Sequence, residues 1–218
     1  ASSFDQPLSF DVTAVTDMSR VFYQALTFDA VLTFDTSNVT SMERMFSEAA
    51  RFNKPLDFDT RSVIDMTALL YNGRAFNQPL DFDTSSVITM DQMFQSAVSF
   101  DQPLTFDLAK VIDMSYTLDN AVALNQPLTF SDTGRVTSTF HMFGNMHDFN
   151  QPLHLDTASV TTMENMFKNV FSFNATLSLD TSNVTSIGSM FAGAVVFNKP
   201  LVFDTSSATT MHALCDNA

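Results

Sequence analysis

The chain has 218 residues, of which 24 are acidic and 10 are basic, so its formal net charge is −14. Long-range repulsion at this charge disfavours nucleic acid, anionic lipid and acidic proteins as partners. A single cysteine excludes a disulfide scaffold, a hydrophobic content of 45% excludes disorder, and no apolar run is long enough to span a bilayer. The 23 Phe and 13 Met indicate one short unit copied many times.

A repeat of 24 residues runs through the whole chain. Its units start with Phe, or once with Leu, at residues 4, 28, 52, 76, 100, 124, 149, 173 and 197. The one step of 25 residues contains an insertion around Gly134. We number the residues of every unit as positions 1 to 24; Leu then fills position 5 in every unit, and all seven Pro fall at position 4. The sequence therefore predicts a single array over residues 1–218.

Each unit predicts a strand, a turn and a helix, in that order. The P-L-x-F-D stretch alternates apolar and polar residues, which is typical of a short strand, and the D-T-S stretch after it is turn chemistry. Positions 15, 18, 19 and 22 are apolar, with the i, i+3, i+4, i+7 spacing of a helix face. In the second unit these residues are Met42, Met45, Phe46 and Ala49. Because so short a strand and helix cannot bury their apolar faces alone, neighbouring units must stack.

The predicted fold class is therefore an α/β repeat solenoid similar to leucine-rich repeats. It has one short parallel strand and one short helix per 24-residue coil, in about nine coils. Helices are about 10 Å wide, twice the strand spacing of about 4.8 Å, so the helical side is expected to fan outward and leave the strands on the concave side. A β-helix without a helical side is the alternative that the same repeat allows.

Neither end of the chain shows the atypical capping unit with which solenoids normally close. Residues 1–3 match positions 22 to 24 of a preceding coil, and the chain stops at position 22 of the ninth coil. We therefore expect a segment of a longer array, or ends that a partner covers.

Position 8 is Asp in eight of the nine coils. These residues are Asp11, Asp35, Asp59, Asp83, Asp107, Asp156, Asp180 and Asp204. Each is expected to accept backbone N–H bonds within its own D-T-S turn. The alternative is a column of calcium sites, because carboxylates suit that ion, although the spacing matches no EF-hand or nonapeptide calcium pattern. No cofactor other than calcium is expected.

Position 6 should point away from the core, because it lies between Leu at position 5 and Phe at position 7. Its residues differ from coil to coil: Ser9, Thr33, Asp57, Asp81, Thr105, Thr129, His154, Ser178 and Val202. Solenoids usually build binding surfaces from such rows of unlike side chains on a regular sheet. This row is the candidate binding face, and a merely solvated face is the alternative.

The remaining polar residues carry no pattern of a catalytic or metal site. The four His lack metal-ligand spacing, and no catalytic Ser/His/Asp set or phosphate loop stands out, so we do not expect an enzyme. Asn or Asp at position 2 of every coil predicts an internal amide ladder. Cys215 occupies position 19, where Phe is usual, and is expected to be a buried thiol.

Several units resemble known surface-protein repeats. The stretches FNKPLDFDTRSVIDM, FNQPLDFDTSSVITMDQMF and FNQPLHLDTASVTTMENMF are similar to repeats of about 25 residues in Mycoplasma and Listeria lipoproteins. The stretch VTSMERMFSEA is also similar to the V-T-x-I-x-x-x-A-F-x-x-C segment of BspA-like leucine-rich repeats. The resemblance covers the whole chain, with a period of 24 and with Ala in place of the BspA-like Cys. It implies a non-enzymatic surface or adhesion module, and no catalytic residue is carried over.

Together, these features predict a binding or adhesion module that is extracellular or at a cell surface. Its partner would be a protein or a glycan, with no nucleic acid and no direct membrane insertion. The alternative is a structural scaffold or linker subunit buried in a larger multiprotein assembly. A free module should be a soluble monomer, whereas a scaffold should aggregate when it is purified alone.

Overall fold

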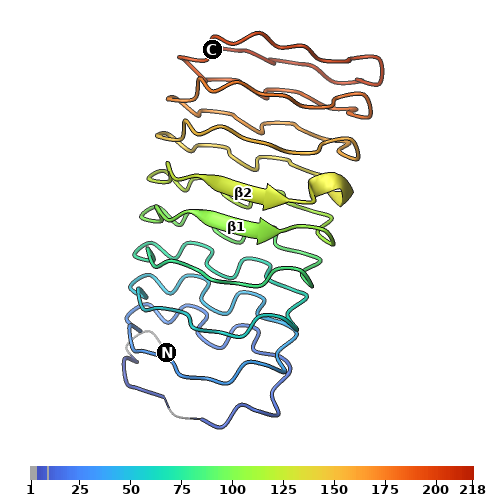
Figure 1. Cartoon of the computed structure of the whole chain (residues 1–218). Helices are drawn as coiled ribbons and strands as arrows, with labels where there is room; N and C mark the ends of the chain where they lie inside the picture. Colours follow the sequence, from blue (N-terminus) through green and yellow to red (C-terminus); the bar gives the residue numbers. More distant parts are fainter. Residues whose placement is uncertain (1–3, 9) are drawn as a thin grey trace.

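The computed structural model describes residues 4–8 and 10–218. The chain winds in coils that lie one on another in a single column (Figure 1). Parallel β-bridges at position 14 join each coil to the next, in a series that runs from Asp17 to Thr210. Bridged residues are 24 apart in sequence, except for the pair Asp113 and Ser138, which are 25 apart. The repeat period is therefore the length of one coil.

Among the described residues, paired strands occur in only two coils, so the prediction of one strand in every coil is wrong. Strand β1 (Leu104–Asp107) pairs in parallel with β2 (Leu128–Ser131), with Leu104 opposite Leu128. A short 3-10 turn, η1 (Thr133–Arg135), follows β2. The residue before η1, Asp132, has a left-handed backbone with φ of 54°. This turn accommodates the extra residue of the sixth coil without disturbing the bridges on either side.

The predicted helix in each coil is wrong, because residues 4–8 and 10–218 contain no α-helix. Positions 15 to 22 instead form a run of successive turns, which we call the turn ribbon (residues 42–49 in the second coil). Positions 17 and 21 have positive φ in every coil, for example 54° at Arg44 and 61° at Glu48. A left-handed residue cannot continue a right-handed helix, so no helix can extend through the ribbon.

Backbone hydrogen bonds explain why the turn ribbon replaces a helix. In the second coil, the N–H groups of Met45, Ser47 and Ala49 donate to carbonyls three residues earlier in the same coil. Alternate N–H groups donate to the next coil: Met42 to Asp65, Arg44 to Thr67, Phe46 to Leu69 and Glu48 to Tyr71. An α-helix would use its N–H groups internally and would need about 10 Å of width.

The turn ribbon lets its side of each coil stack as closely as the strand side. The predicted outward fan and concave strand face therefore lose their physical basis. Figure 1 shows near-parallel layers instead. The coils follow the alternative arrangement, which has no helical side.

The interior is a continuous apolar core of stacked rings and Met side chains. Position 1 forms a column of nearly parallel rings, whose neighbouring centroids are 5.9–6.1 Å apart: Phe28, Phe52, Phe76 and Phe100. Position 19 adds a second column, in which Phe46 lies 4.4 Å from Phe52. The predicted core of Phe, Leu and Met ladders is confirmed.

Two further expectations concern the burial of the cysteine and the presence of membrane-spanning segments. Cys215 is exposed rather than buried in this structure, because it lies in the ninth coil, the last one that the structure describes. Among the residues that the structure describes, no helix has the length and apolar character needed to cross a membrane.

Candidate binding groove

The structure places the position 6 row on the surface. In the third coil, for example, Leu56 and Phe58 are buried on either side of the exposed Asp57. Ser9 lies outside the described residues. The other members of the row are all exposed: Thr33, Asp57, Asp81, Thr105, Thr129, His154, Ser178 and Val202.

This row forms the floor of a shallow groove that crosses successive coils. Three hollows of about 410, 730 and 390 Å³ follow one another along it. The first two share Pro79, Leu80 and Asp81, and the third lies beside His154 and Ser178. We call the three hollows together the strand-face groove.

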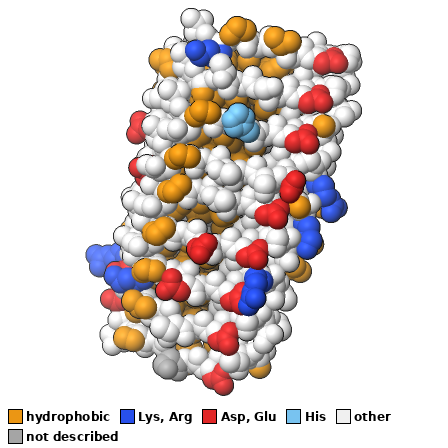
Figure 2. Space-filling model, in the orientation of Figure 1, with side chains coloured by type: hydrophobic (Ala, Val, Ile, Leu, Met, Phe, Trp, Pro, Cys, Tyr) orange, Lys and Arg blue, Asp and Glu red, His pale blue; other side chains and the backbone are white. Residues whose placement is uncertain are grey.

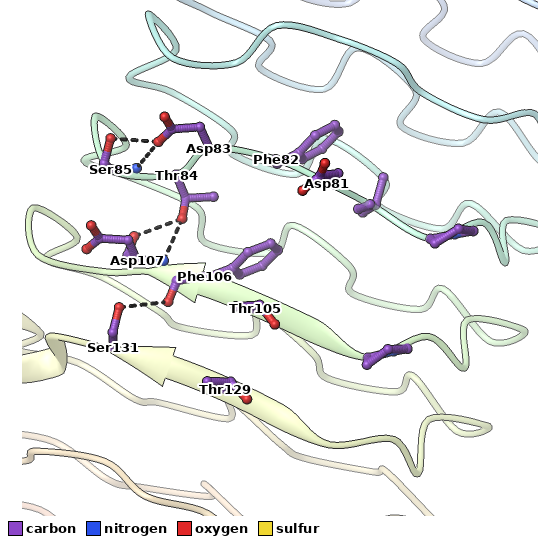
Figure 3. Close-up of a pocket in the computed structure, with 13 residues that line it drawn as sticks. Asp81, Phe82, Asp83, Thr84, Ser85, Thr105, Phe106, Asp107, Thr129 and Ser131 are labelled. Atoms are coloured by element: carbon purple, nitrogen blue, oxygen red, sulfur yellow. Dashed lines mark hydrogen bonds between the residues drawn. The ribbon is translucent and has the colours of Figure 1, made fainter.

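The two edges of the strand-face groove have different chemistry. Pro55, Pro79 and Pro103, at position 4, line it on one side of the floor, and Asp83 and Asp107, at position 8, line it on the other. Figure 2 shows the apolar and acidic columns running along this face. In Figure 3, Asp81, Thr105 and Thr129 follow one another on successive coils, beside a parallel row of Asp83, Asp107 and Ser131.

Sequence reasoning identified the floor of the groove but missed its edges. Pro at position 4 was interpreted as the start of a strand, and Asp at position 8 as turn chemistry. In an extended chain, however, residues two apart point to the same side. The sequence P-L-x-F-D therefore puts positions 4, 6 and 8 on one surface, and this alternation could have predicted the groove.

Each position 8 carboxylate is held by its own turn. One Oδ of each Asp accepts the backbone N–H two residues later, at 2.9–3.2 Å. Asp83 also accepts a bond from the Ser85 hydroxyl, at 2.6 Å. These are the hydrogen bonds that the D-T-S turn predicts.

The same hydrogen bonds lower the pKa values of several position 8 carboxyl groups. Bonds from the Ser85 hydroxyl and backbone N–H lower the pKa of Asp83 below its ordinary value of 3.8. Corresponding turn bonds lower the pKa values of Asp35 and Asp180. For Asp59, bonds from the Arg61 guanidinium and then from the Arg61 backbone lower the pKa to about 2. These hydrogen bonds therefore favour the ionised, negatively charged form of Asp35, Asp59, Asp83 and Asp180.

We expect the Asp59 carboxyl group to titrate near pH 2, below its ordinary pKa of 3.8. Because its folded pKa lies below its ordinary value of 3.8, ionised Asp59 favours the folded state above that value. This contribution disappears as the pH falls through about 2. Carboxyl NMR titration of the wild type and of Arg61→Ser measures the effect.

In Arg61→Ser the pKa of Asp59 should rise, while that of the distant Asp180 should not move. Titration of wild-type Asp59 at its ordinary pKa would contradict the assignment.

The described residues bring no acidic side chains together as a metal site. Within residues 4–8 and 10–218, no group of three or more His, Cys, Asp or Glu is placed to hold a metal ion. The Asp column is engaged turn by turn, as described above. Two of the histidines lie apart from it: His141 Nδ1 is 3.3 Å from Asp119 Oδ1, and His147 stacks on Phe171.

The position 2 residues form a ladder at the surface rather than inside the core. Asn53 Oδ1 accepts the backbone N–H of Asn77, and Asn77 Oδ1 accepts that of Asp101. The series continues to Asn198. Gln78 adds a side-chain bond to Asn53 Oδ1 at 3.1 Å. The ladder therefore ties neighbouring coils together two residues before the Pro edge of the groove.

Comparison with known proteins identifies the repeat but no function. No curated protein and no solved structure matches the chain. A family model described as "Mycoplasma protein of unknown function, DUF285" matches residues 1–81, 56–155 and 153–218, which together span the whole chain. The Mycoplasma-type repeat predicted from the motif is confirmed. The chain belongs to the DUF285 family.

Proposed function

We propose that the chain is a non-enzymatic binding module that holds an extended, positively charged segment of a partner protein in the strand-face groove. The charge of the groove lining carries this proposal. Five of the acidic side chains along it are Asp57, Asp81, Asp83, Asp107 and Asp156. Among the described residues that line the three hollows, none is Lys or Arg.

The shape of the groove supports an elongated partner. It runs from Pro55 in the third coil to Ser178 in the eighth, across the coils rather than along one of them. The Pro edge offers apolar contact for the alkyl stems of Lys and Arg, while the floor and the Asp edge receive their charged heads. Opposite charges of this kind increase the rate of encounter and suppress unsuitable partners.

A location at the cell surface or outside the cell is part of the proposal. It is supported by the resemblance of the repeats to those of Mycoplasma and Listeria lipoproteins and to BspA-like units. The net charge of −14 also argues against nucleic acid as the partner. A scaffold role would bury one flank or one end of the coils permanently, and the size of an assembly measured in solution distinguishes the two.

Binding of an eight-lysine peptide tests the groove directly. We expect the double variant Asp57→Thr/Asp81→Thr to bind this peptide about tenfold more weakly than wild type, because exposed ion pairs are each worth up to about 1 kcal/mol. Thr is the residue that the fifth coil carries at the same position, as Thr105. Isothermal titration calorimetry at low salt measures the affinity, which should fall as salt is added.

The double variant Asp148→Asn/Asp216→Asn is the matched control. It removes the same charge at exposed positions outside the groove, and its affinity should stay within about twofold of wild type. If both double variants lost the same affinity for the peptide, the effect would come from net charge alone and not from the groove. Stronger binding of a neutral oligosaccharide than of the peptide at the groove would also contradict the proposal, as would aggregation of the purified chain.

A further inference from the structure

A separate cavity lies on the turn-ribbon side of the first four coils. It has a volume of about 210 Å³ and is lined by Tyr23, Arg44, Ser47, Glu48, Tyr71 and Gln92. None of these residues lines the strand-face groove. We call this cavity the tyrosine slot.

The slot exists because the side chain at position 20 of the second coil has no aromatic ring, whereas those of the first and third coils do. Position 20 is Tyr23 in the first coil, Ser47 in the second and Tyr71 in the third. A small side chain therefore lies between two aromatic residues on the coils above and below it. Tyr23, Ser47 and Tyr71 all line the resulting space.

The stacked rings of the core give the distance between side chains at the same position of successive coils. Phe52 lies between Phe28 and Phe76, which belong to the coils on either side of its own. Its centroid is 5.9 Å from one ring and 6.1 Å from the other, with interplanar angles of 7° and 8°. One six-membered ring thus fits between two rings on flanking coils. The tyrosine slot repeats this coil spacing at position 20 with the middle ring missing.

Polar groups surround the slot at the place where the edge of an inserted ring would lie. Ser47 is 2% exposed and is one of the residues that line the slot. Glu48 is held in place, since its carboxylate accepts bonds from the Tyr23 hydroxyl at 3.3 Å and from Gln24 Nε2 at 3.2 Å. Arg44 supplies donors only, and Gln92 supplies both a donor and an acceptor.

This combination selects a ring that is apolar on its faces and polar around its edge. We propose that the tyrosine slot binds one pyranose ring of a glycan, with its C–H faces against Tyr23 and Tyr71 and its hydroxyls bonded to the surrounding polar groups. A purely aromatic ring would offer no hydrogen bonds to Arg44, Glu48 or Gln92, whereas the hydroxyls of a sugar can both donate and accept them. A quaternary ammonium ion would suit two aromatic rings, but Arg44 repels it. A phosphate would be repelled by Glu48 and by the net charge.

The test is a titration of the wild-type chain with the methyl glycosides of glucose, galactose, mannose and N-acetylglucosamine. Two readouts apply: ligand-observed NMR, and tyrosine fluorescence, which is specific because the chain has three Tyr and no Trp. We expect saturable binding of at least one glycoside, with a dissociation constant of about 1 mM for a ligand of this size.

Variants of the slot decide where binding occurs. Tyr71→Ala and Ser47→Phe should each weaken it at least tenfold, the first by removing one ring and the second by filling the space. Tyr71→Phe keeps the ring and should retain affinity. Tyr116→Ala is the matched control, because Tyr116 stacks on His141 outside the slot. Thermal melting by circular dichroism shows that each variant is folded.

Three results would overturn the proposal: no saturable binding of any glycoside, equal affinity in wild type and Tyr71→Ala, or saturable binding of tetramethylammonium or inorganic phosphate in place of the glycosides. The slot and the groove are tested independently. The slot variants should bind the eight-lysine peptide normally, and the groove double variant should bind the glycoside normally.

Discussion

Replacing Phe46 by Ala is expected to lower the free energy of unfolding by about 3–5 kcal/mol. Phe46 is fully buried, and its ring stacks on Phe22 at 5.1 Å, Phe52 at 4.4 Å and Phe58 at 6.4 Å. Backbone hydrogen bonds tie the second coil to the coils on both sides, so the structure cannot collapse into the cavity that Ala leaves. Urea unfolding followed by circular dichroism measures the loss.

Phe46→Leu is the matched control, because this chain itself carries Leu at position 19 as Leu70 and Leu118. The Leu variant keeps most of the buried volume and should cost less than about 1.5 kcal/mol. An Ala variant that lost no more stability than the Leu variant would show that the ring column is not tightly packed.

Substitutions of Asn165 distinguish the turn ribbon from a helix, because the two structures predict opposite orders of stability for its Gly and Ala variants. Its φ is 58°, a conformation that costs Ala about 1–2 kcal/mol and Gly almost nothing. Asn165→Gly should therefore be more stable than Asn165→Ala by about 1–2 kcal/mol. In a helix the order would be reversed, because Gly is about 1 kcal/mol worse than Ala there.

The same pair of substitutions at Lys168 provides the comparison. Lys168 lies three residues later in the same turn ribbon and has no positive φ. Ala should be at least as stable as Gly at this position. Chemical denaturation of all four variants gives the two differences, and Ala being favoured at both positions would contradict the left-handed geometry at Asn165.

Most of the core was predictable from the repeat, because a period of 24 residues brings equivalent side chains onto neighbouring coils. Phe52 and Phe76 had to stack once the coils stacked, and Asp83 had to meet the N–H of its own D-T-S turn. The position 6 row was predictable for the same reason, since Leu56 and Phe58 turn Asp57 outward by simple alternation. The Mycoplasma-type motif was likewise visible in the residues themselves.

The choice between a helix and the turn ribbon could not be predicted from apolar spacing, because successive turns and a helix bury the same positions. Met42, Met45, Phe46 and Ala49 face the core in either structure. One signal did favour the turns. The left-handed position 21 carries Asn or Gly, the residues that best tolerate positive φ, in six of the nine coils: Asn72, Asn120, Asn145, Asn169, Gly193 and Asn217. Asn and Gly are poor choices for the middle of a short helix.

The sequence by itself determined the coil length, the number of coils, the residues that face inward and the acidic and proline columns that face outward. These features follow from the repeat period, and the repeat period can be read directly from the order of the residues. Only the tertiary structure decided how each coil closes, because the choice between helix and turn ribbon depends on whether N–H groups bond within a coil or to the next one. The same choice sets the spacing of the coils, and with it the cavity that Tyr23 and Tyr71 line.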